Sequence, residues 1–278
     1  MRPMTGKTCL VTGATSGIGL ETARGLADRG ARVIVVGRDE TRTEAVRREL
    51  GADHGFTADL TDFDQVRRLA AEVGKNYDRL DVLVNNAGVL ATGRRVTADG
   101  HETTFATNHL GPFLLTTLLQ DLLERSAPAR VVTVASAAHR QVRRIPWDDL
   151  AAGTGAAARQ AYPLSKLANV LFTRELARRL NGTGVTANCV HPGVARTSLG
   201  RDVNGVFGAV VNVGLRFVPG PTAGARTSVY VASAPEVGDV TGAYFVQSRP
   251  VTPSVLARDD RAAARLWTLS EQLTRAPR

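Results

Sequence analysis

The stretch "TCLVTGATSGIG" at residues 8–19 decides the expected fold of this chain. A short β-branched run ends at Gly13 and a helical pattern begins near Ile18, so the glycines fall between a strand and a helix. Such a turn brings backbone close to a ligand, and the first helical turn presents free N–H groups to an anion. The glycine spacing differs from the usual dinucleotide fingerprint, and an ordinary strand–helix turn remains the alternative. The expected nucleotide contacts are Gly13, Thr15, Ser16, Gly17, Ile18 and Gly19.

Short apolar runs alternate with longer amphipathic segments along the rest of the chain. The expected strands are 8–13, 31–37, 54–60, 80–88, 129–136, 184–193 and 242–247. Segments such as 18–29, 41–50, 62–75, 102–125 and 161–181 carry helical periodicity. This alternation predicts an α/β fold with a doubly wound parallel sheet of about seven strands and helices on both faces. Because no repeat or linker interrupts the pattern, we expect a single domain over residues 1–278.

Composition and charge restrict the class of protein. The net charge is +9, but the arginines are dispersed, and the densest cluster, "HRQVRR" at 139–144, has no interleaved aromatic residues to stack on bases. We therefore expect no nucleic-acid partner. Cys9 and Cys189 lie far apart in apolar runs and form no metal-binding pair. The chain has no secretory signal and no apolar run of about 18 residues, which predicts a cytoplasmic protein without a transmembrane segment.

Polar residues and glycines gather where the expected strands end. Ligands of doubly wound sheets bind beyond the carboxyl ends of the strands. The residues at those ends are Gly13, Gly17 and Gly19, Arg38, Asp59, Asn85 with Asn86 and Gly88, Ser136, and Pro192 with Gly193. All of them fall on the same edge of the sheet, which predicts one binding site there. The "NNAG" segment at 85–88 also suits a plain turn.

The segment "QAYPLSKLANVLFTREL" at 160–176 carries the strongest chemical signal. Tyr162 and Lys166 share one helix face, and Lys166 is one of only three lysines among 35 basic residues. An ammonium group beside a phenol favours the phenolate and lowers its pKa from about 10. A tyrosine tuned in this way can exchange a proton with a carbonyl or an alcohol, and Ser136 could hydrogen-bond the same oxygen. The alternative is that both are surface residues. Pro163 is compatible with the chemistry only if it lies in the first helical turn.

Together these motifs resemble the short-chain dehydrogenase/reductase superfamily. The resemblance covers nearly the whole chain and includes "TGATSGIG", Asp59-Leu60, "NNAG", "NHLG" with Asn108, Ser136, "YPLSK" and "HPG". Within that superfamily, "DGHETTFATNHLGPFLLT" and "SKLANVLFTRELARRL" are typical of the retinol-dehydrogenase-like branch. The sequence does not show the familiar membrane-anchoring N-terminus of that branch, so we expect a soluble relative. The resemblance implies a Rossmann-type fold and NAD(P)-dependent interconversion of alcohols and carbonyls.

The resemblance also implies a role for each matching residue. Tyr162 would be the acid/base group, Lys166 the ribose anchor and pKa modifier, and Ser136 the group that polarises the carbonyl. Asn108 would hold a water in the proton relay. The implied cofactor contacts also include Asp59 at the adenine, Leu60, Asn86 beside the nicotinamide, Ala87, Gly88, Pro192, Gly193 and Thr197. A catalytically inactive, nucleotide-sensing regulator with the same fold is the alternative function.

The end of the second expected strand predicts the cofactor. In "VVGRDETR", Gly37 would leave room and Arg38 could bind the 2′-phosphate of NADP(H) bidentately, with help from Arg42. Asp39 is the complication, because an acidic residue there could select NAD. Its other interpretation is the N-cap of the next helix. We expect NADP(H).

The segment 195–222 is expected to form the substrate lid. Its apolar residues Val203, Val206, Phe207, Val210, Val211 and Val213 predict a lipophilic small-molecule substrate. A helix packed on a neighbouring subunit, or contact with a membrane surface, are the alternatives. His139, Trp147 and Arg196 are candidates to line the pocket. A homo-oligomer of two to four subunits would be usual for the family.

Overall fold

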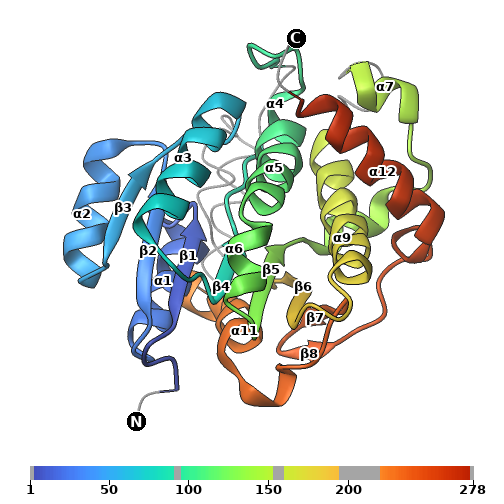
Figure 1. Cartoon of the computed structure of the whole chain (residues 1–278). Helices are drawn as coiled ribbons and strands as arrows, with labels where there is room; N and C mark the ends of the chain where they lie inside the picture. The colour runs from blue at the N-terminus through green and yellow to red at the C-terminus, as the bar shows by residue number, and fades with distance from the viewer. Residues whose placement is uncertain (1–2, 91–94, 153–159, 194–219, 276–278) are drawn as a thin grey trace.

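The computed structural model describes residues 3–90, 95–152, 160–193 and 220–275. Its centre is one eight-stranded sheet with the strand order β3-β2-β1-β4-β5-β6-β7-β8 (Figure 1). The first seven strands run parallel and β8 pairs antiparallel with β7. The strands are β1 (Thr8–Thr12), β2 (Arg32–Gly37), β3 (His54–Thr57), β4 (Val82–Asn85), β5 (Ala129–Val134), β6 (Val185–His191), β7 (Tyr244–Val246) and β8 (Arg249–Pro250).

Helices cover both faces of this sheet, as its continuous apolar strands require. The helices are α1 (Gly17–Ala27), α2 (Glu40–Leu50), α3 (Phe63–Asn76), α4 (Thr103–Phe105), α5 (Gly111–Leu118), α6 (Gln120–Arg125), α7 (Trp147–Ala152), α9 (Ala161–Arg179), α11 (Pro221–Ser233) and α12 (Asp260–Leu273), with a π-helix η1 (Ala106–Leu110) and 3₁₀-helices η2 (Ala137–Gln141), η5 (Pro235–Val237) and η6 (Leu256–Arg258). One apolar core joins the sheet to α3, α5, α9 and α12. A second core joins the other face to α1, α2 and α11. None of the helices in the described ranges is long and apolar enough to cross a bilayer.

The doubly wound parallel sheet predicted from the sequence is confirmed. The helices α7, α11 and α12 lie outside the segments named from the sequence, and two further elements differ from what was expected. The eighth strand was not expected: it has two residues, too few for a pattern, and follows a turn in which Gln247 and Ser248 both have positive φ. The single helix expected at 102–125 is divided into α4, η1, α5 and α6. Gly111 starts the third piece, and a Cβ there would lie 2.3 Å from the carbonyl oxygen of Leu60. This close packing against the chain after β3 explains why the segment is irregular.

The sheet places the binding site through its strand order. β1 pairs with β2 on one side and with β4 on the other, so the connections after β1 and β4 leave the sheet in opposite directions. A crevice opens where the order reverses, beyond the carboxyl ends of the strands. Of the expected lid at 195–222, only 220–222 falls within the described residues, where Pro221 and Thr222 begin α11.

Candidate active site

The glycine-rich turn between β1 and α1 is fastened to the connection after β4. A Cβ on Gly19 would lie 2.2 Å from the carbonyl oxygen of Gly13 and 2.3 Å from Nδ2 of Asn86, so no larger residue fits. The Nδ2 group of Asn86 donates to the carbonyl of Thr12 at 2.8 Å. Ser16 is the N-cap of α1 and makes no capping bond with its side chain. The N–H groups of the first turn therefore remain free to hold an anion.

A cleft of about 450 Å³ lies at this crevice and receives side chains from the ends of four strands. The predicted site residues that line it are Ser16, Gly17, Ile18, Asn86, Gly88, Ser136, Tyr162, Lys166, Pro192 and Gly193. The sheet thus brings together residues separated by up to 177 positions in the chain.

Tyr162 reaches the cleft from the first turn of α9. Gln160 is the N-cap, so Pro163 is the third helical residue, and Leu164 N donates to Gln160 O at 2.8 Å. Proline costs nothing at this position because the N–H groups of a first turn have no intrahelical partner. The condition that the sequence set for Pro163 is met, and Tyr162 is not displaced.

Burial controls the ionisation of the phenol and the ammonium group. It raises the pKa of Tyr162, and a hydrogen bond with Ser136 opposes that rise. The sequence predicted instead that Lys166 would lower the tyrosine pKa. Lys166 is itself buried, which lowers its own pKa to about 8. Its Nζ lies 5.7 Å from the centroid of the Tyr162 ring and donates to the carbonyl of Val134 at 3.0 Å. Low polarity disfavours the charged form of both groups.

Ser136 follows β5 and is the N-cap of η2. Its Oγ accepts a hydrogen bond from the backbone N–H of Ala138 at 3.2 Å. Because the N–H group can only donate, one lone pair of Oγ is occupied, and the hydroxyl also shares a hydrogen bond with Tyr162. Ser136 therefore holds its hydroxyl beside that of Tyr162.

Asn108 is fully buried in the π-helix η1 and lies outside the set that lines the cleft. Its Oδ1 accepts from Val89 N at 2.7 Å, and its Nδ2 donates to Val89 O and to Ser165 Oγ, both at 3.0 Å. Ser165 donates in turn to the carbonyl of Tyr162 at 2.8 Å. Asn108 thus joins the connection after β4 to the first turn of α9.

The end of β2 separates the two interpretations of the "GRD" segment. Asp39 is the N-cap of α2, where its carboxylate accepts from Arg42 N at 2.8 Å. Arg38 is exposed and has no hydrogen bond or ion pair within the described part of the chain. The prediction that Gly37 leaves open space is wrong. A Cβ at this position would lie 2.4 Å from side-chain atoms of both Thr15 and Thr43.

Similarity to known proteins shows the family of this chain. The family described as short chain dehydrogenase matches residues 7–205. This chain belongs to the short-chain dehydrogenase family. Human retinol dehydrogenase 13 is 43% identical over 96% of this chain and 84% of that protein, which confirms the resemblance to the retinol-dehydrogenase-like branch. A crystal structure of a Mycobacterium paratuberculosis protein shares 39% identity and a TM-score of 0.78, covering 97% of this chain and 94% of its own. The Pseudomonas aeruginosa RhlG/NADP active-site complex shares 29% identity and a TM-score of 0.71, covering 88% and 96%.

Other predicted residues of this short-chain dehydrogenase lie around the cleft rather than in it. Gly13, Gly19 and Ala87 form the fastened turn behind the cleft, and a Cβ on Gly13 would lie 2.8 Å from Ala87 Cα. Asp59, at the end of β3, accepts from Thr61 N at 2.9 Å and from Thr61 Oγ1 at 2.8 Å. Leu60 beside it is buried. Thr197 and Arg196, with the apolar lid residues, lie outside the described residues.

The structure also corrects and extends the list. His139 was expected to line the substrate pocket, but it is fully buried behind Ser136. Sequence reasoning missed Val134, Ala135, Ala137, Ala138, Gln141 and His191, which line the cleft. His191 stands directly before Pro192 at the end of β6 and could have been found by its position. The small apolar residues beside Ser136 show no sequence pattern that would predict a place in the cleft.

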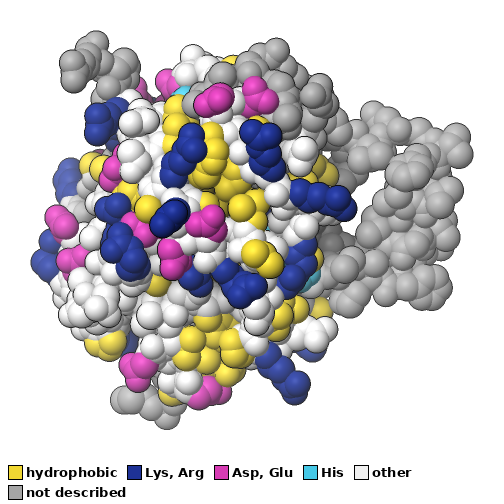
Figure 2. Space-filling view, turned by 90° about the vertical axis from the view of Figure 1, so that its right-hand side faces the viewer, with side chains coloured by type: hydrophobic (Ala, Val, Ile, Leu, Met, Phe, Trp, Pro, Cys, Tyr) yellow, Lys and Arg dark blue, Asp and Glu magenta, His cyan; other side chains and the backbone are white. Residues whose placement is uncertain are grey.

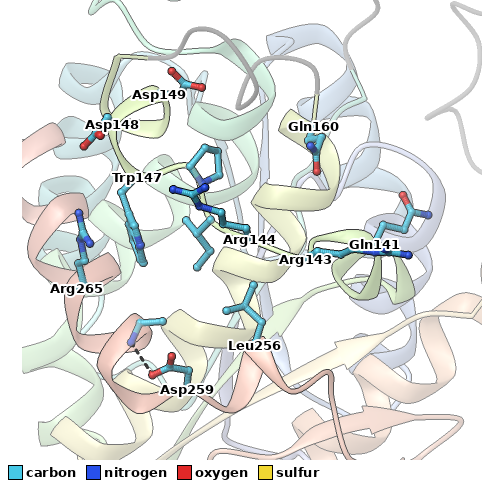
Figure 3. Close-up of a pocket in the computed structure, with 13 residues that line it drawn as sticks. Gln141, Arg143, Arg144, Trp147, Asp148, Asp149, Gln160, Leu256, Asp259 and Arg265 are labelled. Atoms are coloured by element: carbon cyan, nitrogen blue, oxygen red, sulfur yellow. Dashed lines mark hydrogen bonds between the residues drawn. The ribbon is translucent and has the colours of Figure 1, made fainter.

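A second pocket of about 930 Å³ adjoins the cleft, and Gln141 lines both (Figure 3). It lies between the segment after η2, the start of α7 and the N-terminal half of α12. Ile145, Trp147 and Leu256 contribute apolar surface, and the guanidinium of Arg265 lies 4.5 Å from the centroid of the Trp147 ring. On the face of the molecule that holds α7 and α12, arginines border an apolar band (Figure 2).

Proposed function

We propose that this short-chain dehydrogenase uses NADP(H) to interconvert a carbonyl and an alcohol on a lipophilic small molecule. One observation carries the proposal. Within a single cleft, the hydroxyls of Ser136 and Tyr162 are hydrogen-bonded to each other and the buried ammonium of Lys166 lies behind them. Two hydroxyl groups held side by side can both turn to donate to an oxygen that gains negative charge.

The residues of the cleft fit a dinucleotide. Gly17 lines the cleft with no atom within 4 Å of its Cβ position, at the free N–H groups of α1. These groups would hold the pyrophosphate, Arg38 the 2′-phosphate, and Asn86 with Gly88 the nicotinamide side. The bound cofactor supplies or accepts a hydride. The NADP named in the Pseudomonas aeruginosa complex supports the choice of cofactor.

The protein residues would supply the proton. In the reductive direction, Ser136 donates a hydrogen bond to the carbonyl oxygen and holds it beside Tyr162. As hydride reaches the carbonyl carbon, the Tyr162 hydroxyl transfers its proton to that oxygen, and the ammonium of Lys166 stabilises the phenolate that forms. With an ordinary pKa of about 10, a tyrosine is protonated at neutral pH, so the phenol is in the form that can donate. Oxidation follows the reverse path.

The second pocket leaves room for a substrate that extends beyond the cleft, and its lining combines apolar residues with charged ones such as Arg143, Asp148 and Arg265. It continues from the cleft at Gln141 and offers Ile145, Trp147 and Leu256 to a hydrocarbon chain. The names of the retinol dehydrogenases and the valine-rich sequence expected as the lid favour the same substrate class. Each methylene that leaves water on binding contributes about 0.8 kcal/mol, close to fourfold in affinity.

The test compares Tyr162→Phe with wild type by following NADPH oxidation with a homologous series of straight-chain aldehydes and ketones. We expect kcat to fall by roughly a hundredfold or more while the Kd of NADPH changes less than about twofold. Tyr230→Phe, which removes a phenol from α11, is the matched control and should retain kcat. We also expect kcat/KM of the wild type to rise with chain length.

Three results would contradict the proposal. A Tyr162→Phe enzyme that kept a tenth of kcat would remove Tyr162 from proton transfer. Equal or better activity on short charged ketoacids would exclude the lipophilic substrate. NADPH binding without turnover of any substrate in the series would indicate the nucleotide-sensing alternative.

A further inference from the structure

His139 connects the turn that carries Ser136 to a segment 115 residues later in the chain. Its Nδ1 lies 2.7 Å from the carbonyl oxygen of Ser136, and its Nε2 lies 3.1 Å from the backbone nitrogen of Ser254. The side chain is fully buried, and its ring packs edge-on against Tyr244 with the centroids 5.0 Å apart. Both ring nitrogens are therefore engaged by backbone groups of two different elements.

These two contacts determine the tautomer. The backbone N–H of Ser254 can only donate, so Nε2 of His139 must accept. The ring hydrogen consequently lies on Nδ1 and is donated to the carbonyl of Ser136. The ring is neutral, and burial lowers its pKa in agreement with that state.

The contact restrains the residue that faces the substrate. The carbonyl of Ser136 also accepts the backbone N–H of His139 at 3.2 Å, so one residue holds that carbonyl with two donors. With its carbonyl held from behind, Ser136 keeps Oγ on the Ala138 N–H at the wall of the cleft. Ala137, Ala138 and Gln141 in the same turn line the cleft. An apolar residue would fill the volume at 139 without supplying either hydrogen bond.

We infer that His139 is a positioning residue that fixes the orientation of Ser136 from behind the cleft, anchored in turn by Ser254. The inference rests on the role proposed for Ser136 and concerns a residue that touches neither substrate nor cofactor. The hydrogen bond from Nδ1–H to the carbonyl of Ser136 orients Ser136, and the hydrogen bond that Nε2 accepts from Ser254 N–H anchors the ring.

Two substitutions separate the contributions of the Nδ1 and Nε2 hydrogen bonds. In His139→Asn, the amide N–H₂ can take the place of Nδ1–H, whereas in His139→Gln the longer side chain reaches the position of Nε2. We expect His139→Asn to keep kcat within about threefold of wild type. His139→Gln should lose roughly ten- to a hundredfold in kcat, with the KM of NADPH unchanged, because the reacting groups are misplaced.

Arg140→Ala is the matched control. The Arg140 side chain donates to Thr252 O at 2.7 Å and so ties the same later segment to η2 without touching Ser136. It should keep kcat. Equal kcat in the Asn and Gln variants would overturn the role of His139, provided that Tyr162→Phe is inactive. An active Tyr162→Phe enzyme would instead overturn the proposed function.

Because either His139 variant could misfold, ¹⁵N NMR of the histidine rings in the wild-type protein provides a second test. We expect the spectrum to show that Nδ1 of His139 is protonated. Protonation at Nε2 would overturn the inference.

Discussion

Arg38 and Asp39 are neighbours at the end of β2, yet their side chains have different surroundings. The Asp39 carboxylate is committed to the N-terminus of α2, while the Arg38 guanidinium is exposed and has no partner among the described residues. The two residues offered opposite cofactor preferences in the sequence. The observed cap assigns Asp39 to the helix and leaves the Arg38 guanidinium available for the phosphate contact that we propose.

At this scale we predict that Arg38→Ala weakens NADPH binding by about ten- to a hundredfold and leaves NADH binding nearly unchanged. A charge-assisted contact to phosphate contributes about 1.5–3 kcal/mol, and NADH lacks the phosphate. Titration of intrinsic fluorescence with each cofactor measures both constants. Asp39→Asn is the control, since asparagine preserves the cap and removes the charge. A wild-type enzyme that bound NADH more tightly than NADPH, with the preference altered by Asp39→Asn, would assign the selectivity to Asp39.

At the scale of elements, the turn between β1 and α1 depends on the connection after β4. Thr12 Oγ1 accepts hydrogen bonds from the backbone N–H groups of Asn86 and Ala87 at 3.0 and 3.1 Å. The side-chain Nδ2 of Asn86 also donates a hydrogen bond to the carbonyl oxygen of Thr12. The two connections therefore form one unit on either side of the crevice. Gly13 and Gly19 are required for the close approach of the two connections, whether or not a ligand is bound.

We predict that Gly19→Ala damages this unit. The new Cβ would meet the backbone of Gly13, which cannot move aside as a flexible side chain can. The expected cost is about 1–3 kcal/mol in the free energy of unfolding, with at least a tenfold loss in NADPH affinity. Gly74→Ala in α3 is the matched control, because nothing lies within 4 Å of its Cβ position. It should stabilise the protein by about 0.5–1 kcal/mol. Urea unfolding and NADPH titration measure both variants, and unchanged NADPH affinity in Gly19→Ala would contradict the prediction.

At the scale of the whole molecule, the core that joins the sheet to α5, α9 and α12 encloses a histidine. His109 is 1% exposed, packs against Phe105, Phe113 and Phe172, and bonds Ser270 Oγ through Nε2 at 2.9 Å. Burial lowers its pKa from 6.5 to about 3. The folded protein therefore holds this ring neutral, whereas the unfolded chain protonates it below pH 6.5.

The sign of the effect on stability follows from this difference. As pH falls from 6.5 towards 3, His109 binds a proton in the unfolded state but stays neutral in the folded state. The free energy of unfolding therefore decreases. By pH 5 the loss from His109 is about 2 kcal/mol, at about 1.4 kcal/mol per pH unit. His109→Gln should lack this component in urea unfolding at pH 7.5 and pH 5. Burial also lowers the pKa of His139 and His191, but both are present in the two proteins and cancel in the comparison. Equal losses in wild type and variant would contradict the prediction.

The sequence by itself determined the elements and the edge of the sheet where the site lies. Local periodicity distinguishes a buried parallel strand from an amphipathic helix, and the carboxyl ends of parallel strands converge wherever the sheet forms. Ser136 and Asn86 could therefore be predicted to lie at the same edge of the sheet without coordinates. The two-residue strand β8 and the divided segment 102–125 escaped prediction because no local pattern signals them.

Tertiary structure alone decided how each polar group is used. The same residue types could have met a ligand or each other, and the choice depends on partners far away in the chain. Asn108 bonds Ser165, 57 residues later, and His139 bonds Ser254, 115 residues later. Gly37 receives Thr15 and Thr43 where the sequence suggested open space. Burial also overrode the expected effect of Lys166 on Tyr162, because desolvation depends on everything packed around a group and a four-residue spacing reports only one neighbour.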